Sequence, residues 1–322
     1  MQVATAPAAA AGRADLALRL YRMMVRVRFF EEFCIDLRKR NEVVANTYPS
    51  LGQEASVAVA AALGPDDVVF PSYRSRPAFF GRGVTAEDHF VEMLATPDST
   101  LHGREVFHHA SFPAKGVMPG SSMIGGWLPM AAGYALTQKM EGGNGITACH
   151  MGDGTFGAGD LHETLNLAGI WKLPFMLVCE NNGYQVSQHW SKMRVQREMR
   201  AYFEPHGFTC LEVDGNDALA AYDAALHGRG IAAGGTPVLL DCFTYRMGSY
   251  SSHFPEPRKG IEQEKADWLA KDPLARGRDA CAGLGLSLQQ LDQAVGEERA
   301  QIAAAWERAQ ARARSQPESK TS

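Results

Sequence analysis

The stretch Met151-Gly152-Asp153-Gly154-Thr155 is followed, one helix length later, by Glu180-Asn181-Asn182-Gly183-Tyr184. A hydrophobic run over 146–151 leads into the first stretch, and another over 175–179 leads into the second. Between them, apolar residues at helical spacing predict a helix that ends before Pro174. Because such crossovers are right-handed and join neighbouring strands, the pattern predicts a strand–helix–strand unit with two parallel strands.

Two polar side chains follow the ends of these predicted strands. Asp153 and Asn182 are expected to lie together, because parallel strands end at the same edge of a sheet, where open α/β sheets bind ligands. A carboxylate, an amide oxygen and a main-chain carbonyl suit Mg²⁺, which normally keeps bonds to phosphate oxygens. Glycines beside Asp153 let a phosphate approach the backbone, and a helix beginning near Gly159 directs its positive end there. The residues indicate a metal and a diphosphate cofactor, with a plain pair of turns as the open alternative.

The composition is that of an ordinary globular protein. The chain has 322 residues, of which 45% are hydrophobic and 21% charged, and its net charge is −4. This charge argues against a nucleic-acid binder, and no apolar run is long enough to cross a bilayer. The Ala-rich start lacks the basic and hydrophobic parts of a secretory signal, and the six cysteines form no CxxC pair. We therefore expect a cytoplasmic protein with reduced cysteines in its core.

No internal repeat divides the chain. We expect one domain over 13–312, with flexible tails at 1–12 and 313–322. A Gly-, Pro- and His-rich region over 97–126 is too long for a simple connection, and loops of this kind usually form sites.

Helical spacing predicts two further elements. Apolar residues indicate a long helix over 15–40, whose opposite side carries Arg22, Arg26 and Arg28 and is expected to face solvent or an interface. Another helix is expected over 193–203.

Several stretches together resemble the α subunit of the thiamine-diphosphate-dependent 2-oxoacid dehydrogenases, which include the pyruvate, branched-chain 2-oxoacid and acetoin enzymes. They follow the family's order and spacing over about 20–269. The matching stretches are Gly52-Gln53-Glu54-Ala55, Tyr73-Arg74, Gly152-Asp153-Gly154, 162–168, 171–174, Glu180-Asn181-Asn182-Gly183-Tyr184, 213–217 and Thr244-Tyr245-Arg246. The resemblance implies the thiamine-diphosphate-binding fold, an α/β fold with a mostly parallel sheet and helices on both faces.

The same resemblance assigns a cofactor site. It implies that Mg²⁺ is held by Asp153, the side chain of Asn182 and the main-chain oxygen of Tyr184. The groups that would bind the diphosphate are Tyr73, Arg74 and Arg246, with the backbone around Gly152, Gly154 and Thr155. Arginine suits this role because its guanidinium stays charged and donates two hydrogen bonds in a fixed fork. The backbone at Ser122 and Ile124 would contact the aminopyrimidine ring.

Two tyrosines depart from the family's pattern in the catalytic region. Tyr48 stands where many relatives have an active-site histidine, and Tyr250 stands at the place of the loop histidine that the family links to acyl transfer. A histidine can carry a proton near neutral pH, whereas a tyrosine, with a reference pKa of about 10, mainly donates a hydrogen bond. His253 and His109 are the candidates to replace the missing imidazoles. These departures weaken the expectation of acyl transfer to a lipoyl group.

The resemblance implies an enzyme that decarboxylates a 2-oxoacid and transfers the acyl unit. A partner β subunit would supply the activating glutamate within an α₂β₂ heterotetramer, and a lipoyl acyltransferase is a possible further partner. An alternative is a two-subunit carboligase or transketolase-like synthase that transfers the acyl anion to an aldehyde or ketone, which the two tyrosines motivate. A third reading is a cofactor-binding scaffold without turnover.

Overall fold

A sheet of five parallel strands forms the centre of the molecule in the order β1-β2-β3-β7-β6. The computed structural model describes residues 7–43, 45–105, 107–196 and 198–315. The strands of this sheet are β1 (Val68–Phe70), β2 (Thr147–Gly152), β3 (Phe175–Asn181), β6 (Thr209–Asp214) and β7 (Val238–Phe243). A small antiparallel pair, β4 (Tyr184–Gln185) and β5 (Gln188–His189), follows β3. The expected α/β architecture is confirmed, and β2 and β3 are direct neighbours.

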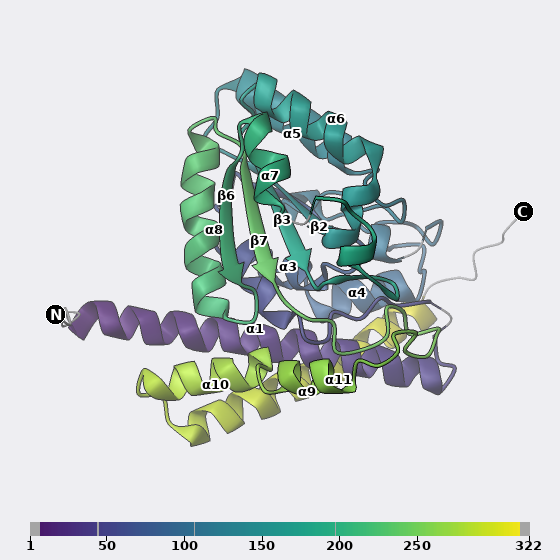
Figure 1. Ribbon diagram of the computed structural model, residues 1–322. Helices are drawn as coiled ribbons and strands as arrows, with labels where there is room; N and C mark the ends of the chain where they lie inside the picture. Colours follow the sequence, from purple (N-terminus) through teal and green to yellow (C-terminus); the bar gives the residue numbers. More distant parts are fainter. Residues whose placement is uncertain (1–6, 44, 106, 197, 316–322) are drawn as a thin grey trace, which may run out of the picture.

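Helices cover both faces of this sheet (Figure 1). The α-helices are α1 (Pro7–Lys39), α2 (Val57–Ala61), α3 (Arg76–Gly81), α4 (Ala86–Met93), α5 (Leu128–Glu141), α6 (Gly159–Ile170), α7 (Arg200–Phe203), α8 (Ala218–Ala233), α9 (Glu262–Leu269), α10 (Pro273–Gly283) and α11 (Leu288–Arg314). Short 3₁₀ turns include η1 (Glu54–Ser56), η2 (Phe107–His109) and η4 (Asp153–Gly157). In Figure 1, α5 and α6 lie at the top, and α1 runs along the base with α9, α10 and α11.

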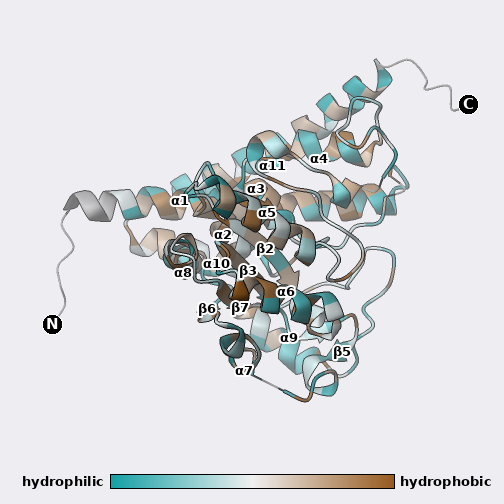
Figure 2. Ribbon diagram, turned by 90° about the horizontal axis from the view of Figure 1, so that it is seen from above, coloured by the Kyte–Doolittle hydropathy of each residue, from teal (hydrophilic) through white to brown (hydrophobic). Residues whose placement is uncertain are grey.

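The strands are apolar on both sides because both sides are covered by helices. In β3, Met176 and Val178 pack into a core with α1, α2 and α8. The alternate residues Leu177 and Cys179 pack into a second core with α5, α6 and α7. Figure 2 shows these hydrophobic strands at the centre of the fold. The period of two along a strand thus assigns successive side chains to opposite helical layers.

The arginines of α1 pair with acidic side chains elsewhere in the chain. Arg22 and Arg26 both pair with Glu298 of α11, a fully buried carboxylate, at 2.9 and 2.7 Å. Arg28 pairs with Glu54 at 2.5 Å and with Asp272 at 2.9 Å. This face therefore forms an interface with other segments of the same chain and is not a fully solvated face. Burial of a carboxylate requires a partner of opposite charge, so these arginines join α1 to other parts of the same chain.

Some predicted boundaries shift. Helix α7 covers only the end of the helix expected over 193–203; before it, Arg194 packs over the rings of Phe156 and Trp190 at 4.7 and 4.6 Å. Residues 7–12 of the expected N-terminal tail belong to α1, while 1–6 and 316–322 lie outside the described residues. The single domain over 13–312 remains a prediction. Among the helices described, none is both long and apolar enough for a membrane span.

Candidate functional site

Four neighbouring strands deliver the predicted site residues to one edge of the sheet. Tyr73 and Arg74 follow β1, Asp153 follows β2, Asn182 follows β3, and Arg246 follows β7. Each lies one to four residues beyond the last residue of its strand. Because the strands are parallel, their carboxyl ends meet, which is where open α/β sheets place their ligands.

These residues line one pocket of about 540 Å³ that is open to solvent. It brings together most of the predicted site, namely Tyr73, Arg74, Ile124, Gly152, Asp153, Gly154, Thr155, Asn182, Tyr184, Arg246 and Tyr250. Tyr48 and Ser122 do not line it. At Gly152 an added Cβ would meet no atom within 4 Å, so the backbone there stays open to a ligand.

The carboxylate of Asp153 is buried in the wall of this pocket. The residue is 3% exposed, and neither side-chain oxygen accepts a hydrogen bond of normal geometry from the described residues. Burial raises the pKa of this carboxyl to about 6, against the opposing effects of Arg194 and of the backbone N–H groups of Asp153 and Asn182. A buried carboxylate without a partner is costly, so the arrangement favours a bound cation.

Asn182 is the second predicted metal ligand that lines the pocket, besides Asp153. Its side chain is buried, and its Oδ1 accepts a hydrogen bond of 3.1 Å from the backbone N–H of Tyr184. The described residues contain no group of three or more His, Cys, Asp or Glu side chains that could hold a metal. One carboxylate with amide and main-chain oxygens is nevertheless a donor set that suits Mg²⁺, because this ion takes its other ligands from water and phosphate. The residues fit the expected metal.

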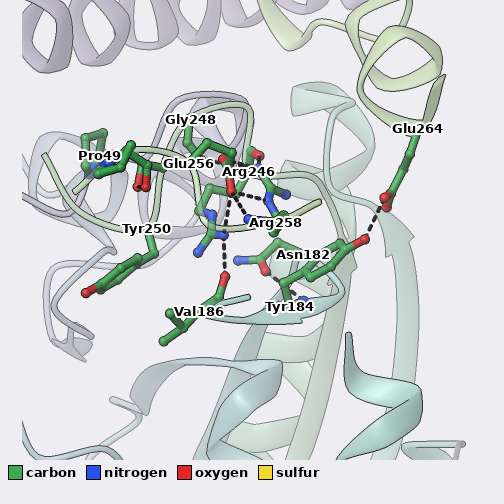
Figure 3. Close-up of polar contacts among 12 residues, drawn as sticks. Pro49, Asn182, Tyr184, Val186, Arg246, Gly248, Tyr250, Glu256, Arg258 and Glu264 are labelled. Carbon is green, nitrogen blue, oxygen red and sulfur yellow. Dashed lines mark hydrogen bonds and ion pairs between the residues drawn. The ribbon is translucent and has the colours of Figure 1, made fainter. Parts of the chain in front are cut away.

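Positive charge also lines this pocket, and Figure 3 shows Arg246 with its neighbours Val186, Glu256 and Arg258. Arg246 is 1% exposed; its Nη2 donates to the carbonyl of Val186 at 2.6 Å, and its Nε has no partner among the described residues. Burial, reinforced by the charges of Arg74 and Arg258, lowers the pKa of Arg246 to about 9. The nearest carboxylate, Glu256, is 4.0 Å away. A buried cation beside other cations fits an anionic ligand such as diphosphate.

The two tyrosines occupy different places. Tyr250 lines the pocket, its carbonyl accepts a hydrogen bond of 2.9 Å from Arg74, and its ring stacks on Phe254. The ring of Tyr48 packs edge-on against the ring of Tyr73, with centroids 4.7 Å apart. In the view of Figure 3, Arg246 lies between Tyr250 and Tyr184. The structure therefore places Tyr250, but not Tyr48, on the pocket surface.

The side chain of Ser122 belongs to a chain of polar groups outside the pocket lining. Its hydroxyl lies 2.7 Å from Nε2 of His109 and 3.0 Å from Nε2 of His108, and Nδ1 of His109 lies 3.0 Å from Glu105. Burial lowers the pKa of His108 to about 3, so this imidazole is neutral. The other candidate histidine, His253, contacts Arg38 and does not line the pocket.

Some lining residues were not predicted from the sequence as site residues. These are Gln53, Ser72, Glu180, Gln185 and Val186, while Trp127, which its position in the family suggested as a residue narrowing the pocket, also lines it. Gln53 and Glu180 lie within stretches that resemble the family, so their position was the available signal. Trp127 is 1% exposed and donates a hydrogen bond to the carbonyl of His150, which gives it a packing role as well.

A tight turn positions the strand end that carries Arg246. Gly52 has φ +89°, its carbonyl accepts a hydrogen bond from Thr244, and an added Cβ would collide with the carbonyl oxygen of Tyr245. We expect Gly52→Ala to lower the free energy of unfolding by about 2 kcal/mol or more, measured by urea denaturation. The control is Gly83→Ala, where φ is +82° but no atom lies within 4 Å. Equal losses in the two variants would contradict a role for the contact.

A buried carboxylate beside the site predicts a pH dependence of stability. Asp241 is 3% exposed and accepts a hydrogen bond from Asn181; burial is the main cause that raises its pKa to about 7. The folded state then holds this proton more tightly than the unfolded state, so the free energy of unfolding falls as pH rises from about 4 through 7. Asp241→Asn should remove this dependence and stabilise the protein at pH 8 by on the order of 3 kcal/mol.

Chemical denaturation from pH 4 to pH 8 measures this effect. The exposed Asp279→Asn serves as the control and should retain the slope of the original chain. Parallel profiles for the original chain and Asp241→Asn would show that Asp241 titrates normally.

Comparison with known proteins gives a consistent result. Residues 21–321 match the family described as "Dehydrogenase E1 component". The 2-oxoisovalerate dehydrogenase subunit alpha 1, mitochondrial, of Arabidopsis thaliana is 32% identical over 82% of this chain and 56% of its own length. The corresponding mitochondrial subunit of Caenorhabditis elegans is 30% identical over 81% of this chain and 61% of its own length. The pyruvate dehydrogenase E1 component subunit alpha of Staphylococcus aureus is 32% identical over 84% of this chain and 71% of its own length.

The chain thus spans between about half and two thirds of the plant and nematode proteins. The prediction of a cytoplasmic location is contradicted, because those two relatives are named as mitochondrial proteins. The match covers nearly the whole chain and includes every stretch on which the resemblance rested. The chain therefore belongs to the dehydrogenase E1 component family, that of the thiamine-diphosphate-dependent 2-oxoacid dehydrogenases.

Proposed function

We propose that this chain is the α subunit of a heteromeric thiamine-diphosphate-dependent enzyme that decarboxylates a 2-oxoacid and transfers the acyl unit. One observation carries the proposal: a single pocket contains both the buried Arg246 guanidinium and the Asp153 carboxylate, which has no hydrogen-bond partner among the described residues. A metal diphosphate is a ligand that neutralises both. Family membership adds the identity of the organic part of the cofactor.

The roles of the individual residues follow from this placement. Asp153, the Asn182 side chain and the Tyr184 main-chain oxygen would hold Mg²⁺. Tyr73, Arg74 and Arg246 would bind the diphosphate, together with the backbone at Gly152, Gly154 and Thr155. Ile124 lines the pocket where the backbone would contact the aminopyrimidine ring, whereas the Ser122 side chain is engaged by the two histidines. When bound, thiamine diphosphate supplies the electron sink that decarboxylation of a 2-oxoacid requires.

A chain of polar side chains includes Ser122, which is two residues from the pocket-lining Ile124. With Glu105 at its Nδ1, the neutral His109 imidazole carries its hydrogen there and accepts a hydrogen bond from the Ser122 hydroxyl at Nε2. Tyr250 lines the pocket, and the Tyr48 ring packs against the ring of Tyr73.

The proposed assembly is an α₂β₂ heterotetramer. The β subunit would supply the glutamate that activates the cofactor, and a lipoyl acyltransferase would accept the acyl unit. The relatives reported above are all named as dehydrogenases, so the comparisons do not favour the carboligase alternative.

Product analysis tests the proposal. The chain is co-expressed with a β subunit, supplied with Mg²⁺ and thiamine diphosphate, and given pyruvate, 2-oxoisovalerate and other 2-oxoacids with a lipoyl domain or an aldehyde as acceptor. We expect an acylated lipoyl domain, and no product from the isolated chain. A hydroxyketone without lipoyl acylation would show a carboligase instead, and no turnover despite cofactor binding would show a scaffold.

A further inference from the structure

Gln53 is a buried amide on the pocket wall with one unused donor. Its side chain is 1% exposed, and its Nε2 has no hydrogen-bond partner among the described residues. Its Oε1 accepts a hydrogen bond of 3.3 Å from Nδ2 of Asn182. A buried amide donor without an acceptor costs about 1–3 kcal/mol, so this position favours a ligand that offers an acceptor.

The orientation of both amides follows from a single backbone group. The N–H of Tyr184 can only donate, so the atom that it meets on Asn182 at 3.1 Å must be the oxygen, Oδ1. Nδ2 of Asn182 therefore faces Gln53 and requires an acceptor there. Gln53 must present its oxygen to Asn182, which leaves its own Nε2 as the unpaired donor. The assignment of nitrogen and oxygen is thus determined by the hydrogen-bond network.

The backbone around Gln53 is held firmly. The N–H of Gln53 donates to the carbonyl of Ser50 at 2.8 Å, and the N–H of Gly52 donates to the buried carboxylate of Glu54. Glu54 is in turn paired with Arg28. Because this support does not depend on the side chain of Gln53, the amide is presented to the pocket by a rigid segment.

The acceptor that Gln53 would meet is anionic. Arg74 and Arg246 line the same pocket and attract negative charge, while Asp153 faces the metal position. We infer that Gln53 is a further cofactor-binding residue: its Nε2 donates to an oxygen of the metal-bound diphosphate, and its Oε1 orients the Asn182 amide whose oxygen serves the metal. This inference rests on the proposed function.

Two substitutions separate the two roles. Gln53→Met keeps the size of the side chain and removes both hydrogen bonds, so affinity should fall roughly 10- to 100-fold for thiamine diphosphate and by a smaller factor for the metal alone. Gln53→Glu keeps an acceptor for Asn182 but places a negative charge beside the diphosphate. It should weaken thiamine diphosphate binding by a similar factor without weakening the metal.

The measurements use the complex with the β subunit. Thiamine diphosphate affinity is measured by calorimetry at saturating Mg²⁺, and metal affinity without diphosphate is measured with Mn²⁺ by electron paramagnetic resonance. Gln138→Glu is the control, because Gln138 bonds to Thr147 and lies outside the pocket. Thermal melting without ligands reports whether each variant folds. If Gln53→Met does not fold, the test can still be made with Gln53→Glu.

The outcomes are distinct. Weaker cofactor binding in Gln53→Met and Gln53→Glu, with metal binding weakened only in Gln53→Met, supports both roles. Affinities within twofold of the original complex would overturn the inference while leaving the proposed function intact. If the original complex binds no thiamine diphosphate, the proposed function fails, and the inference fails with it.

Discussion

Asp153→Asn is expected to weaken the binding of Mg²⁺ and thiamine diphosphate roughly 100- to 5000-fold. The substitution keeps the shape of the side chain but removes the buried negative charge that faces the metal position, and loss of one partner from a buried charge pair costs about 3–5 kcal/mol. The measurement is calorimetric titration of the complex with the β subunit.

The same substitution should have the opposite effect on the cofactor-free protein. Both Asp153 oxygens lack a partner among the described residues, so a neutral amide relieves an unfavourable burial and raises the melting temperature. Asp160→Asn, at the exposed start of α6, is the matched control and should change neither quantity. Unchanged cofactor affinity in Asp153→Asn would remove Asp153 from the metal site.

Arg246→Met is expected to weaken thiamine diphosphate binding roughly 10- to 100-fold. A hydrogen bond to a charged group contributes about 1.5–3 kcal/mol, and this guanidinium is buried beside the unpartnered Asp153. The preference for thiamine diphosphate over thiamine monophosphate should shrink, because a cation contributes more to binding the more highly charged ligand. Competitive titration of the two ligands measures both effects.

Arg246→Lys tests the geometry of this group. It retains the charge but not the planar fork, so it cannot bond Val186 and an anion in the same way, and an intermediate affinity is expected. The exposed Arg308→Met is the control for loss of a positive charge. The role of Arg246 would be refuted by an unchanged preference between the two ligands in Arg246→Met.

Without cofactor, Arg246→Met should melt no lower than the original chain, because burial and the charges of Arg74 and Arg258 already disfavour the charged form of Arg246.

Local sequence patterns predicted correctly the structure that depends on interactions between residues close in sequence. The unit from 146 to 182 predicted neighbouring parallel strands, and β2 and β3 pair in register with Gly152 opposite Glu180. In a strand–helix–strand unit the connecting helix is part of the same short segment, so the carboxyl ends of its two strands usually lie together at one edge of the sheet. The helix expected over 193–203 is shorter than predicted: Arg194 contacts the ring of Phe156, 38 residues away, and helical propensity alone is a weak determinant that tertiary context can override.

The side-chain partners of the site depended on contacts between distant segments. The family pattern placed Tyr48 and Tyr250 alike in the active region, yet of these two only Tyr250 lines the pocket, while the Tyr48 ring packs against Tyr73. Gln53 could not be distinguished from its neighbours in sequence. Its free donor becomes apparent only once Asn182, 129 residues away, is seen to use its oxygen.

The sequence by itself determined the α/β class, the parallel β2–β3 pair and the family, because strand periodicity and the turn residues after each strand are local properties. Only the tertiary structure decided that Arg246 and Asp153 line the same pocket and that the α1 arginines pair with Glu298 and Glu54. Strand β7 lies between β3 and the edge strand β6, although β6 comes before β7 in the chain. Such pairings depend on which distant segments pack together, and the burial of charge that results is a property of the folded molecule.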